Sequence, residues 1–154
     1  MCGVVNTIHT LTQTDYKDIM KVLEFRKVLE SGSAALAAVR ADQVQIDRLA
    51  QMLTVMQKKI KEPEAFVQTD MQFHLELSRA SGNVLIEGAL QSVLGQTFRS
   101  SKQLNYLFGY QDGIYYHQKI LDAVRKRDNA KAKKWMEEHM QHAMDRLPEK
   151  LEPQ

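Results

Sequence analysis

The chain has 154 residues, of which 44% are hydrophobic and 26% are charged, and its formal net charge is +2 at pH 7. These values are ordinary for one water-soluble domain, and so small a charge gives no reason by itself to expect nucleic-acid binding. The single cysteine, Cys2, excludes a disulfide within the chain, and no apolar run approaches the roughly 20 residues of a membrane span. We therefore expect a cytoplasmic protein.

The first elements in chain order are a linker and two helices. Residues 1–14 are neither basic nor apolar enough for a signal peptide, and we interpret them as a linker. Apolar residues then recur with helical spacing and predict a helix over 15–40. Asp42 with Gln45 three residues later has the pattern of a capping box, which predicts the start of a helix over 43–61.

The rest of the chain continues with helical patterns separated by short breaks. The predicted helices cover 63–80, a segment that begins after Asn83, 112–127 and 128–147, with a loop or short helix over 101–113 and a C-terminal tail over 148–154. No segment shows the alternation of a strand. We therefore predict an all-α fold, an antiparallel bundle of six to seven helices formed by residues 15–147.

Two polar residues lie on the apolar face of the helix that contains "TDMQFHLELSRASGN". Asp70 and His74 are four residues apart, so they share a helix face, which Phe73 and Leu77 border. A carboxylate and an imidazole that point into a core each need a buried partner.

Two further histidines are predicted to lie opposite each other in the last two helices. His117 precedes the turn at Arg127 by ten residues, and His139 follows it by twelve. At about 1.5 Å per residue, the two imidazoles lie within one helical turn of the same height in a hairpin. Three helices can thus offer one carboxylate and three imidazoles.

Carboxylate and imidazole are ligands for zinc, nickel, manganese or iron at neutral pH. Asp70, His74, His117 and His139 are therefore candidate ligands of a divalent metal, zinc first. The residues leave an alternative open, in which the histidines are hydrogen-bonded core residues of a structural bundle. We expect His142, three residues after His139, to lie beside the site or at the surface.

Enzyme motifs are scarce in this sequence. It has no HExxH, no Glu-x-x-His, no glycine-rich phosphate loop and no nucleophile elbow. A metalloenzyme with water on the metal is the alternative, and Glu76 and Glu138 are the candidate bases for it. We predict that the chain is not an enzyme.

Several motifs together resemble a known family. They are Arg26 and Glu30 before an alanine-rich helix, Asp70-x-x-Phe73-His74 followed by Ser81-Gly82-Asn83, His117 in the penultimate helix, and Ala132, Met136 and His139 in the last. In this order they resemble the effector-binding C-terminal domain, of FCD type, of GntR-family transcriptional regulators of the FadR branch. The resemblance covers residues 15 to 145.

The resemblance implies a helical bundle with a central pocket and a divalent metal held by Asp70, His74, His117 and His139. It also implies a small carboxylate effector that Arg26 contacts, although a salt bridge from Arg26 to Glu30 is the alternative from spacing alone. Tyr115, Tyr116 and Trp135 are candidates for pocket walls. Family members carry an N-terminal winged helix-turn-helix and usually form homodimers. We expect this chain to be the sensor half, with DNA binding only through a winged-helix domain that it lacks.

Overall fold

The computed structural model describes residues 16–96 and 110–151, and these residues form six α-helices and no strand. The helices are α2 (Tyr16–Arg40), α3 (Gln43–Lys58), α4 (Pro63–Ala80), α5 (Val84–Gln96), α7 (Tyr110–Arg125) and α8 (Asn129–Leu151). The predicted all-α fold is confirmed. The linker predicted over 1–14 and most of the loop predicted over 101–113 lie outside the described residues.

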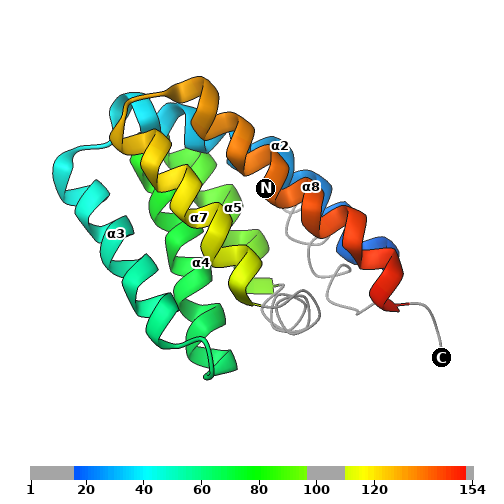
Figure 1. Ribbon diagram of the computed structural model, residues 1–154. Helices are drawn as coiled ribbons and strands as arrows, with labels where there is room; N and C mark the ends of the chain where they lie inside the picture. Colours follow the sequence, from blue (N-terminus) through cyan, green and yellow to red (C-terminus); the bar gives the residue numbers. More distant parts are fainter. Residues whose placement is uncertain (1–15, 97–109, 152–154) are drawn as a thin grey trace.

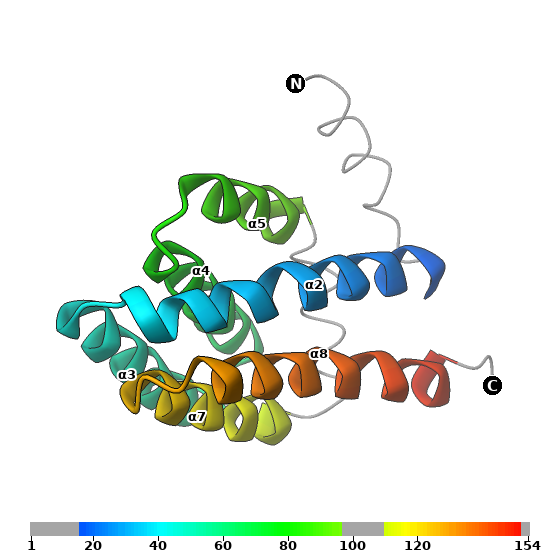
Figure 2. The ribbon, with the colours of Figure 1, turned by 90° about the horizontal axis from the view of Figure 1, so that it is seen from above.

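The two longest helices, α2 and α8, lie antiparallel and side by side along most of their length (Figure 1). Helices α3, α4 and α7 form the other half of the bundle, and α5 packs on α4 and α2. Seen from above, α5 lies on one side of α2 and α8 on the other (Figure 2). Helices α2, α4, α7 and α8 therefore surround a common interior.

Local chemistry explains where two of the helices begin. Asp42 Oδ1 accepts a hydrogen bond of 2.8 Å from the Gln45 backbone N–H, and Gln45 Oε1 accepts one of 3.0 Å from the Asp42 N–H. This is the predicted capping box, which satisfies two backbone donors at the start of α3. Pro63 occupies the first turn of α4, where a missing N–H costs nothing.

Helix ends differ from the predictions by a few residues. Helix α3 ends at Lys58 instead of 61, with Lys59 as its C-cap, whose N–H donates to the carbonyls of Val55 and Met56. Helix α7 begins at Tyr110 and ends at Arg125, and α8 continues to Leu151, past the predicted end at 147.

Helix α7 ends in a Schellman motif, and Arg127, not a glycine, occupies its left-handed position. Arg127 has φ 58°, in the left-handed region, and the Asp128 N–H donates to the Ala123 carbonyl at 2.9 Å. The Arg127 side chain offsets the strain of that backbone, because its Nη1 donates to the Ala41 carbonyl at 2.6 Å. The bond ties the α7–α8 turn to the end of α2.

The core is built from one face of each helix around closely packed α2 and α8. Ala34, Ala37 and Ala38 on α2 are fully buried, and these small side chains allow α8 to approach closely. Large apolar side chains fill the space between α2, α3, α4, α7 and α8. They are Leu23, Leu49, Phe73, Leu77, Ile120, Leu121 and Met136. A polar cluster interrupts this apolar interior.

Candidate metal centre

Three of the predicted metal ligands meet at one point between α4 and α7. Asp70 Oδ1 lies 3.5 Å from His74 Nε2 and 3.3 Å from His117 Nε2. The two Nε2 atoms are 3.0 Å apart. All three side chains are buried. Asp70 and His74 share a face because one helical turn separates them, and α7 brings His117 opposite.

His139 adds a third imidazole from α8. Its ring centroid lies 5.6 Å from that of His74 and 5.1 Å from that of His117. One donor atom from each of the three histidines lies within 4.8 Å of the others, and His139 is only half-buried. The structure thus brings together all four residues that the sequence singled out. Whether they bind a metal stays a prediction.

The spacing of these atoms fits a shared metal ion. Two ligand atoms that each lie about 2.1 Å from one ion at a right angle are about 3.0 Å apart. The distances of 3.0, 3.3 and 3.5 Å among Asp70 Oδ1, His74 Nε2 and His117 Nε2 have this size. Two imidazole nitrogens with lone pairs facing each other repel without a cation or proton between them. The donor set therefore suits a divalent ion of borderline character such as zinc.

Glu30 of α2 orients the His74 ring through Nδ1, the ring nitrogen that does not face Asp70 and His117. The Nδ1 of His74 is in direct contact with Glu30 Oε1, and Arg26 Nε donates to Glu30 Oε2 at 2.6 Å. A proton on Nδ1 is thereby directed at the carboxylate, which leaves the Nε2 lone pair facing Asp70 and His117. Carboxylates behind metal-binding histidines commonly fix the tautomer in this way. Sequence reasoning named Glu30 as part of the family motif and as a partner for Arg26, but did not predict its contact with His74, because that contact is tertiary.

The charges of the cluster shift the pKa values of its members in opposite directions. Burial lowers the pKa of His74, but the carboxylates of Glu30 and Asp70 outweigh it and raise that pKa to about 9. Burial, together with the charge of His74, lowers the pKa of His117 to about 3 despite the nearby Asp70. Burial and the neighbouring His117 and His74 place the pKa of His139 well below its ordinary value. Without metal, one imidazole of the cluster is charged at neutral pH.

The two carboxyl groups stay ionised. Burial raises the pKa of Glu30, but Arg26 and His74 lower it to about 2 overall. For Asp70, burial has the same raising effect, which His74 and His117 outweigh, so its pKa lies well below the ordinary range. At neutral pH, Glu30 therefore forms a buried charge pair with Arg26, and Asp70 offers an anionic ligand atom.

Arg26, the predicted effector contact, is buried, and its exposed fraction is only 7%. The salt bridge to Glu30, the alternative from spacing alone, is present in the structure. An effector contact of Arg26 therefore has to be made while its Nε is held by Glu30. The guanidinium can make such a contact because both of its Nη groups carry further N–H donors besides the Nε–H that Glu30 holds.

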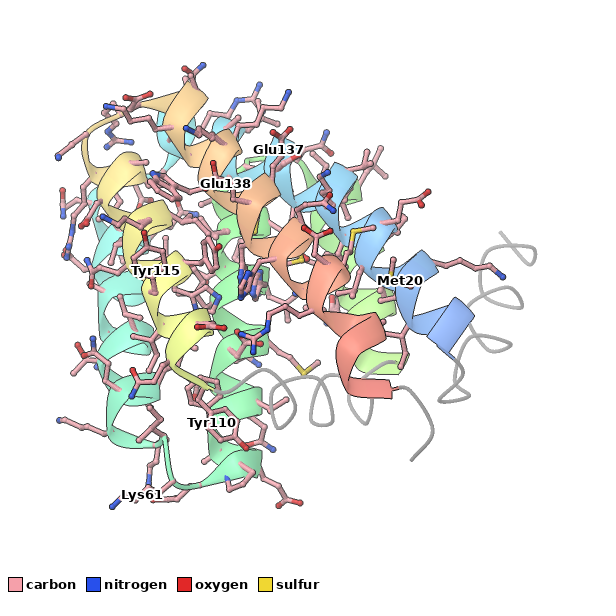
Figure 3. The ribbon with its side chains drawn as sticks, turned by 45° about the vertical axis from the view of Figure 1, so that its right-hand side comes forward. Met20, Lys61, Tyr110, Tyr115, Glu137 and Glu138 are labelled. Carbon is pink, nitrogen blue, oxygen red and sulfur yellow. The ribbon has the colours of Figure 1, made fainter. Side chains whose placement is uncertain are left out.

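The aromatic candidates divide into one that borders the cluster and two that do not. The Tyr116 ring centroid lies 5.1 Å from that of His139. Tyr115 packs against Trp135 at 6.3 Å and is 51% exposed. Figure 3 shows the helices that carry Tyr115 and Glu138, and the Glu138 side chain is 43% exposed, with its Oε1 3.7 Å from Lys134 Nζ.

A second polar group lies at the edge of the cluster and links α7 to α8. Asp112 Oδ2 is 2.9 Å from His142 Nε2 and accepts a hydrogen bond of 2.7 Å from Arg146 Nη1. The Tyr116 ring lies 5.6 Å from the His142 ring. His142 is thus a neighbour of the site, one of the two positions expected for it. The sequence pattern gave Asp112 only a role at a helix start.

A cavity of about 590 Å³ opens between α3 and α4, lined by Arg48, Gln51, Met52, Val55, Gln68, Thr69, Met71, Gln72 and Leu75. None of the four candidate ligands lines it. The central pocket that the resemblance implies therefore stays a prediction.

Comparison with known proteins identifies the family. Residues 21–142 match the model of the FCD domain. The chain belongs to the FCD family. This identification confirms the resemblance drawn from the motifs.

The relatives of this FCD domain are transcriptional regulators. The HTH-type transcriptional regulator LutR of Bacillus subtilis is 30% identical over 138 residues, which cover 85% of this chain and 63% of LutR. The Uxu operon transcriptional regulator of Escherichia coli is 30% identical over 145 residues, covering 84% of this chain and 53% of that protein. The FCD domain thus spans about half to two thirds of these relatives. These relatives agree with the predicted effector-binding domain of a GntR-family transcriptional regulator, and they are named as regulators and not as enzymes.

Solved structures support the fold. Streptococcus agalactiae GntR matches with a TM-score of 0.72 and 21% identity, covering 86% of this chain and 61% of that one. McbR/YncC of E. coli matches with a TM-score of 0.76 and 15% identity, covering 89% and 71%. Both matches show that the FCD domain has the same helical arrangement. In the described residues no helix is both long enough and apolar enough to cross a membrane.

The contact between Glu30 and His74 leads to a prediction about pH. A metal ion held by these residues would have to displace the proton of His74, so metal affinity is expected to rise with pH until about 9, the pKa of His74. Glu30→Gln removes a charge that raises this pKa, so the rise should end at lower pH. Above pH 9 the variant should bind metal about 10- to 100-fold more weakly.

Competition with a chromophoric chelator across pH 6 to 10 measures this effect. Glu24→Gln, a change at an exposed glutamate six residues earlier on α2, is the control and should leave the curve unchanged. Identical curves for the wild type and Glu30→Gln would show that Glu30 does not act on His74.

Proposed function

We propose that this FCD domain is a metal-dependent receptor for a small carboxylic acid and that it controls a GntR-type transcriptional regulator. The observation that carries the proposal is the meeting of Asp70 Oδ1, His74 Nε2 and His117 Nε2 at the spacing of atoms that share one ion. His139 completes a set of one carboxylate and three imidazoles. Zinc is the first candidate, and nickel, manganese and iron are the alternatives.

The charge of the proposed site favours an anionic effector. Asp70 contributes −1, and three neutral imidazoles contribute nothing, so a divalent ion leaves the site at about +1. A bound metal would supply an electrophilic anchor for a carboxylate, and Arg26, whose field reaches Asp70, offsets the negative charge of Glu30, so the site as a whole keeps a charge of about +1. A small acid, or a hydroxy acid with two donor oxygens, fits this combination.

One relative supports this class of ligand. A putative L-lactate dehydrogenase operon regulatory protein of E. coli is 27% identical over 143 residues, which cover 90% of this chain and 55% of that protein. L-lactate is a small hydroxy acid. We propose that the present domain binds an acid of this general class without assigning L-lactate itself.

The proposal extends to the whole regulator. Several relatives are named as HTH-type transcriptional regulators. We propose that DNA is bound by a winged helix-turn-helix domain joined to this domain, in a cytoplasmic homodimer. Acid binding at the metal would then shift the balance between DNA-binding and non-binding arrangements of the dimer.

Elemental analysis of the purified protein tests the proposal. We expect about one divalent ion per chain after desalting. A protein that carries no metal, and takes up none of the four candidate ions when they are added, would favour the structural bundle with hydrogen-bonded histidines.

Arg26 leads to a prediction about the effector. Arg26→Lys keeps the charge beside Glu30 but loses the planar fork, so acid affinity should fall about tenfold or more while metal content stays near that of the wild type. Calorimetric titration with an acid found by screening measures this effect. Arg79→Lys, a change in a half-exposed arginine that pairs with Glu76 and Glu87, is the control. Equal affinity in Arg26→Lys and the wild type would remove the guanidinium from the effector site.

A further inference from the structure

Three polar side chains form a group where α7 begins and α8 ends, at one edge of the candidate metal centre. Asp112 Oδ2 is 2.9 Å from His142 Nε2 and accepts a hydrogen bond of 2.7 Å from Arg146 Nη1. The start of α7 and the end of α8 lie at the same end of the bundle (Figure 1). We call Asp112, His142 and Arg146 the rim group.

The rim group is continuous with the candidate metal ligands. His139, His142 and Arg146 are three and four residues apart, so they share a face of α8. The Tyr116 ring lies 5.1 Å from the His139 ring and 5.6 Å from the His142 ring. Burial distinguishes the two parts, because His117 is fully buried, whereas the side chains of the rim group are 33% to 39% exposed. The rim group is thus a solvent-facing edge of the same site.

The rim group is displaced from the candidate ligands along the bundle. Asp112 precedes His117 by five residues on α7. On α8, Arg146 follows His139 by seven residues. These separations correspond to rises of about 7.5 and 10.5 Å along the helices, and the Arg146 side chain leans back toward His139 because helical side chains lean toward the N-terminus. A ligand that reaches from the proposed metal to Arg146 therefore needs a chain of several carbon atoms.

Asp112 holds the position at which a carboxylate of a ligand could contact Arg146. The side chains of this ion pair are 39% and 33% exposed, and water screens such pairs, so they contribute little to stability. Asp112 also lies in the first turn of α7, where the positive end of the helix dipole favours a carboxylate that has no other partner. Replacement of Asp112 by a carboxylate of a ligand therefore costs little.

The charges at the two ends of the site favour a ligand with two carboxylates. The proposed metal centre keeps a charge of about +1, since Arg26 offsets Glu30. Arg146 adds a charge of +1 when Asp112 no longer faces it. Two carboxylates joined by a carbon chain match these charges, and a guanidinium holds a carboxylate through parallel N–H bonds. An acid with an apolar tail gains no such contact.

We propose that the rim group is a second subsite of the receptor and that the effector is a dicarboxylic acid, which replaces Asp112 on Arg146 and His142. One carboxylate of the acid binds at the metal centre and the other at the rim group, with the Tyr116 ring beside the chain between them. The assignment deepens the proposed function and rests on it for the first carboxylate. Asp112 is then an internal competitor that sets the affinity for the second carboxylate.

Calorimetric titration of the metal-loaded 154-residue chain tests the proposal. The probes are the linear diacids from butanedioate to heptanedioate, each paired with the monoacid of the same chain length. We expect the tightest diacid to bind about tenfold more tightly than its monoacid. Arg146→Gln should abolish this preference, and Asp112→Asn should raise the diacid affinity about threefold to fivefold because it removes the competing charge. Monoacid affinity and metal content should stay unchanged in both variants.

Two matched variants serve as controls. Arg125→Gln changes an arginine at the opposite end of α7 whose side chain is 46% exposed, and Asp145→Asn changes an exposed aspartate next to Arg146. Both should leave every affinity unchanged. A rise in affinity cannot come from a misfolded chain, so Asp112→Asn keeps the test decisive even if Arg146→Gln is unstable.

The outcomes distinguish this subsite from the receptor as a whole. Equal affinities for each diacid and its monoacid would overturn the second subsite, and so would a diacid preference that neither Arg146→Gln nor Asp112→Asn alters. Monoacid binding that depends on the metal would still support the proposed function in those cases. If no carboxylic acid binds the metal-loaded protein, the proposed function fails and the second subsite fails with it.

Discussion

Replacement of His117 with alanine is expected to remove the bound metal almost completely. His117 is fully buried, and its Nε2 lies 3.0 Å from His74 Nε2 and 3.3 Å from Asp70 Oδ1. Its loss takes away one of the four proposed donors. We expect metal affinity to fall more than about 100-fold, beyond the losses seen when only a partner of a ligand is removed.

Metal per chain, measured by elemental analysis after desalting, checks this prediction. His139→Ala should behave in the same way, whereas His142→Ala, three residues further on α8, should retain the metal because that ring pairs with Asp112. The His117 ring also stacks on Phe73 at 4.3 Å, so circular dichroism has to show that the variant is folded. Folded His117→Ala with a full complement of metal would exclude His117 as a ligand.

Removal of the metal is expected to lower the melting temperature by about 5–10 °C. An ion that binds only the folded state at one hundred times its dissociation constant adds about 2.7 kcal/mol, and about 1 kcal/mol corresponds to 2–4 °C for a domain of this size. Calorimetric melts with and without a chelator measure the difference. Equal melting temperatures, with metal removal confirmed, would contradict a stabilising metal.

The size of this difference should depend on pH in a defined direction. In the metal-free protein the pKa of His74 is about 9, above its unfolded value of about 6.5, so its contribution to stability is complete below pH 6.5 and is lost as the pH rises through 9. Metal binding opposes this trend because it displaces the same proton. The difference between metal-loaded and metal-free melts should therefore increase from pH 6 to 9.

The lowered pKa values of His117 and His139 make the stability of the metal-free protein depend on pH in the opposite direction to His74. The pKa of His117 is about 3 in the folded state, below the unfolded value, so its contribution is present above about pH 6.5 and is lost as the pH falls toward 3. The pKa of His139 is lowered in the same sense. The metal-free protein should therefore be destabilised in acid.

Much of the fold follows from local patterns in the sequence. Six helices were predictable because apolar spacing, the Asp42–Gln45 capping box and Pro63 act within a few residues. The exact ends were not predictable in the same way. The end of α7 depends on Arg127, whose left-handed backbone is tied to the Ala41 carbonyl of a distant helix.

The candidate site was partly predictable for the same physical reason. Asp70 and His74 share a face by helical spacing, and a hairpin places His117 and His139 at similar heights. Contacts between helices that are not neighbours in sequence carry no such signal. The contact of Glu30 of α2 with His74 of α4 is of this kind, and only the structure reveals it.

The measurement that tests the central claim most directly is a thermal-shift screen of small carboxylic and hydroxy acids on metal-loaded and chelator-treated protein. We predict that at least one acid raises the melting temperature of the metal-loaded wild type and that this shift disappears after chelation and in His117→Ala. An acid that stabilises the chelated and metal-loaded proteins equally would contradict a metal-anchored effector.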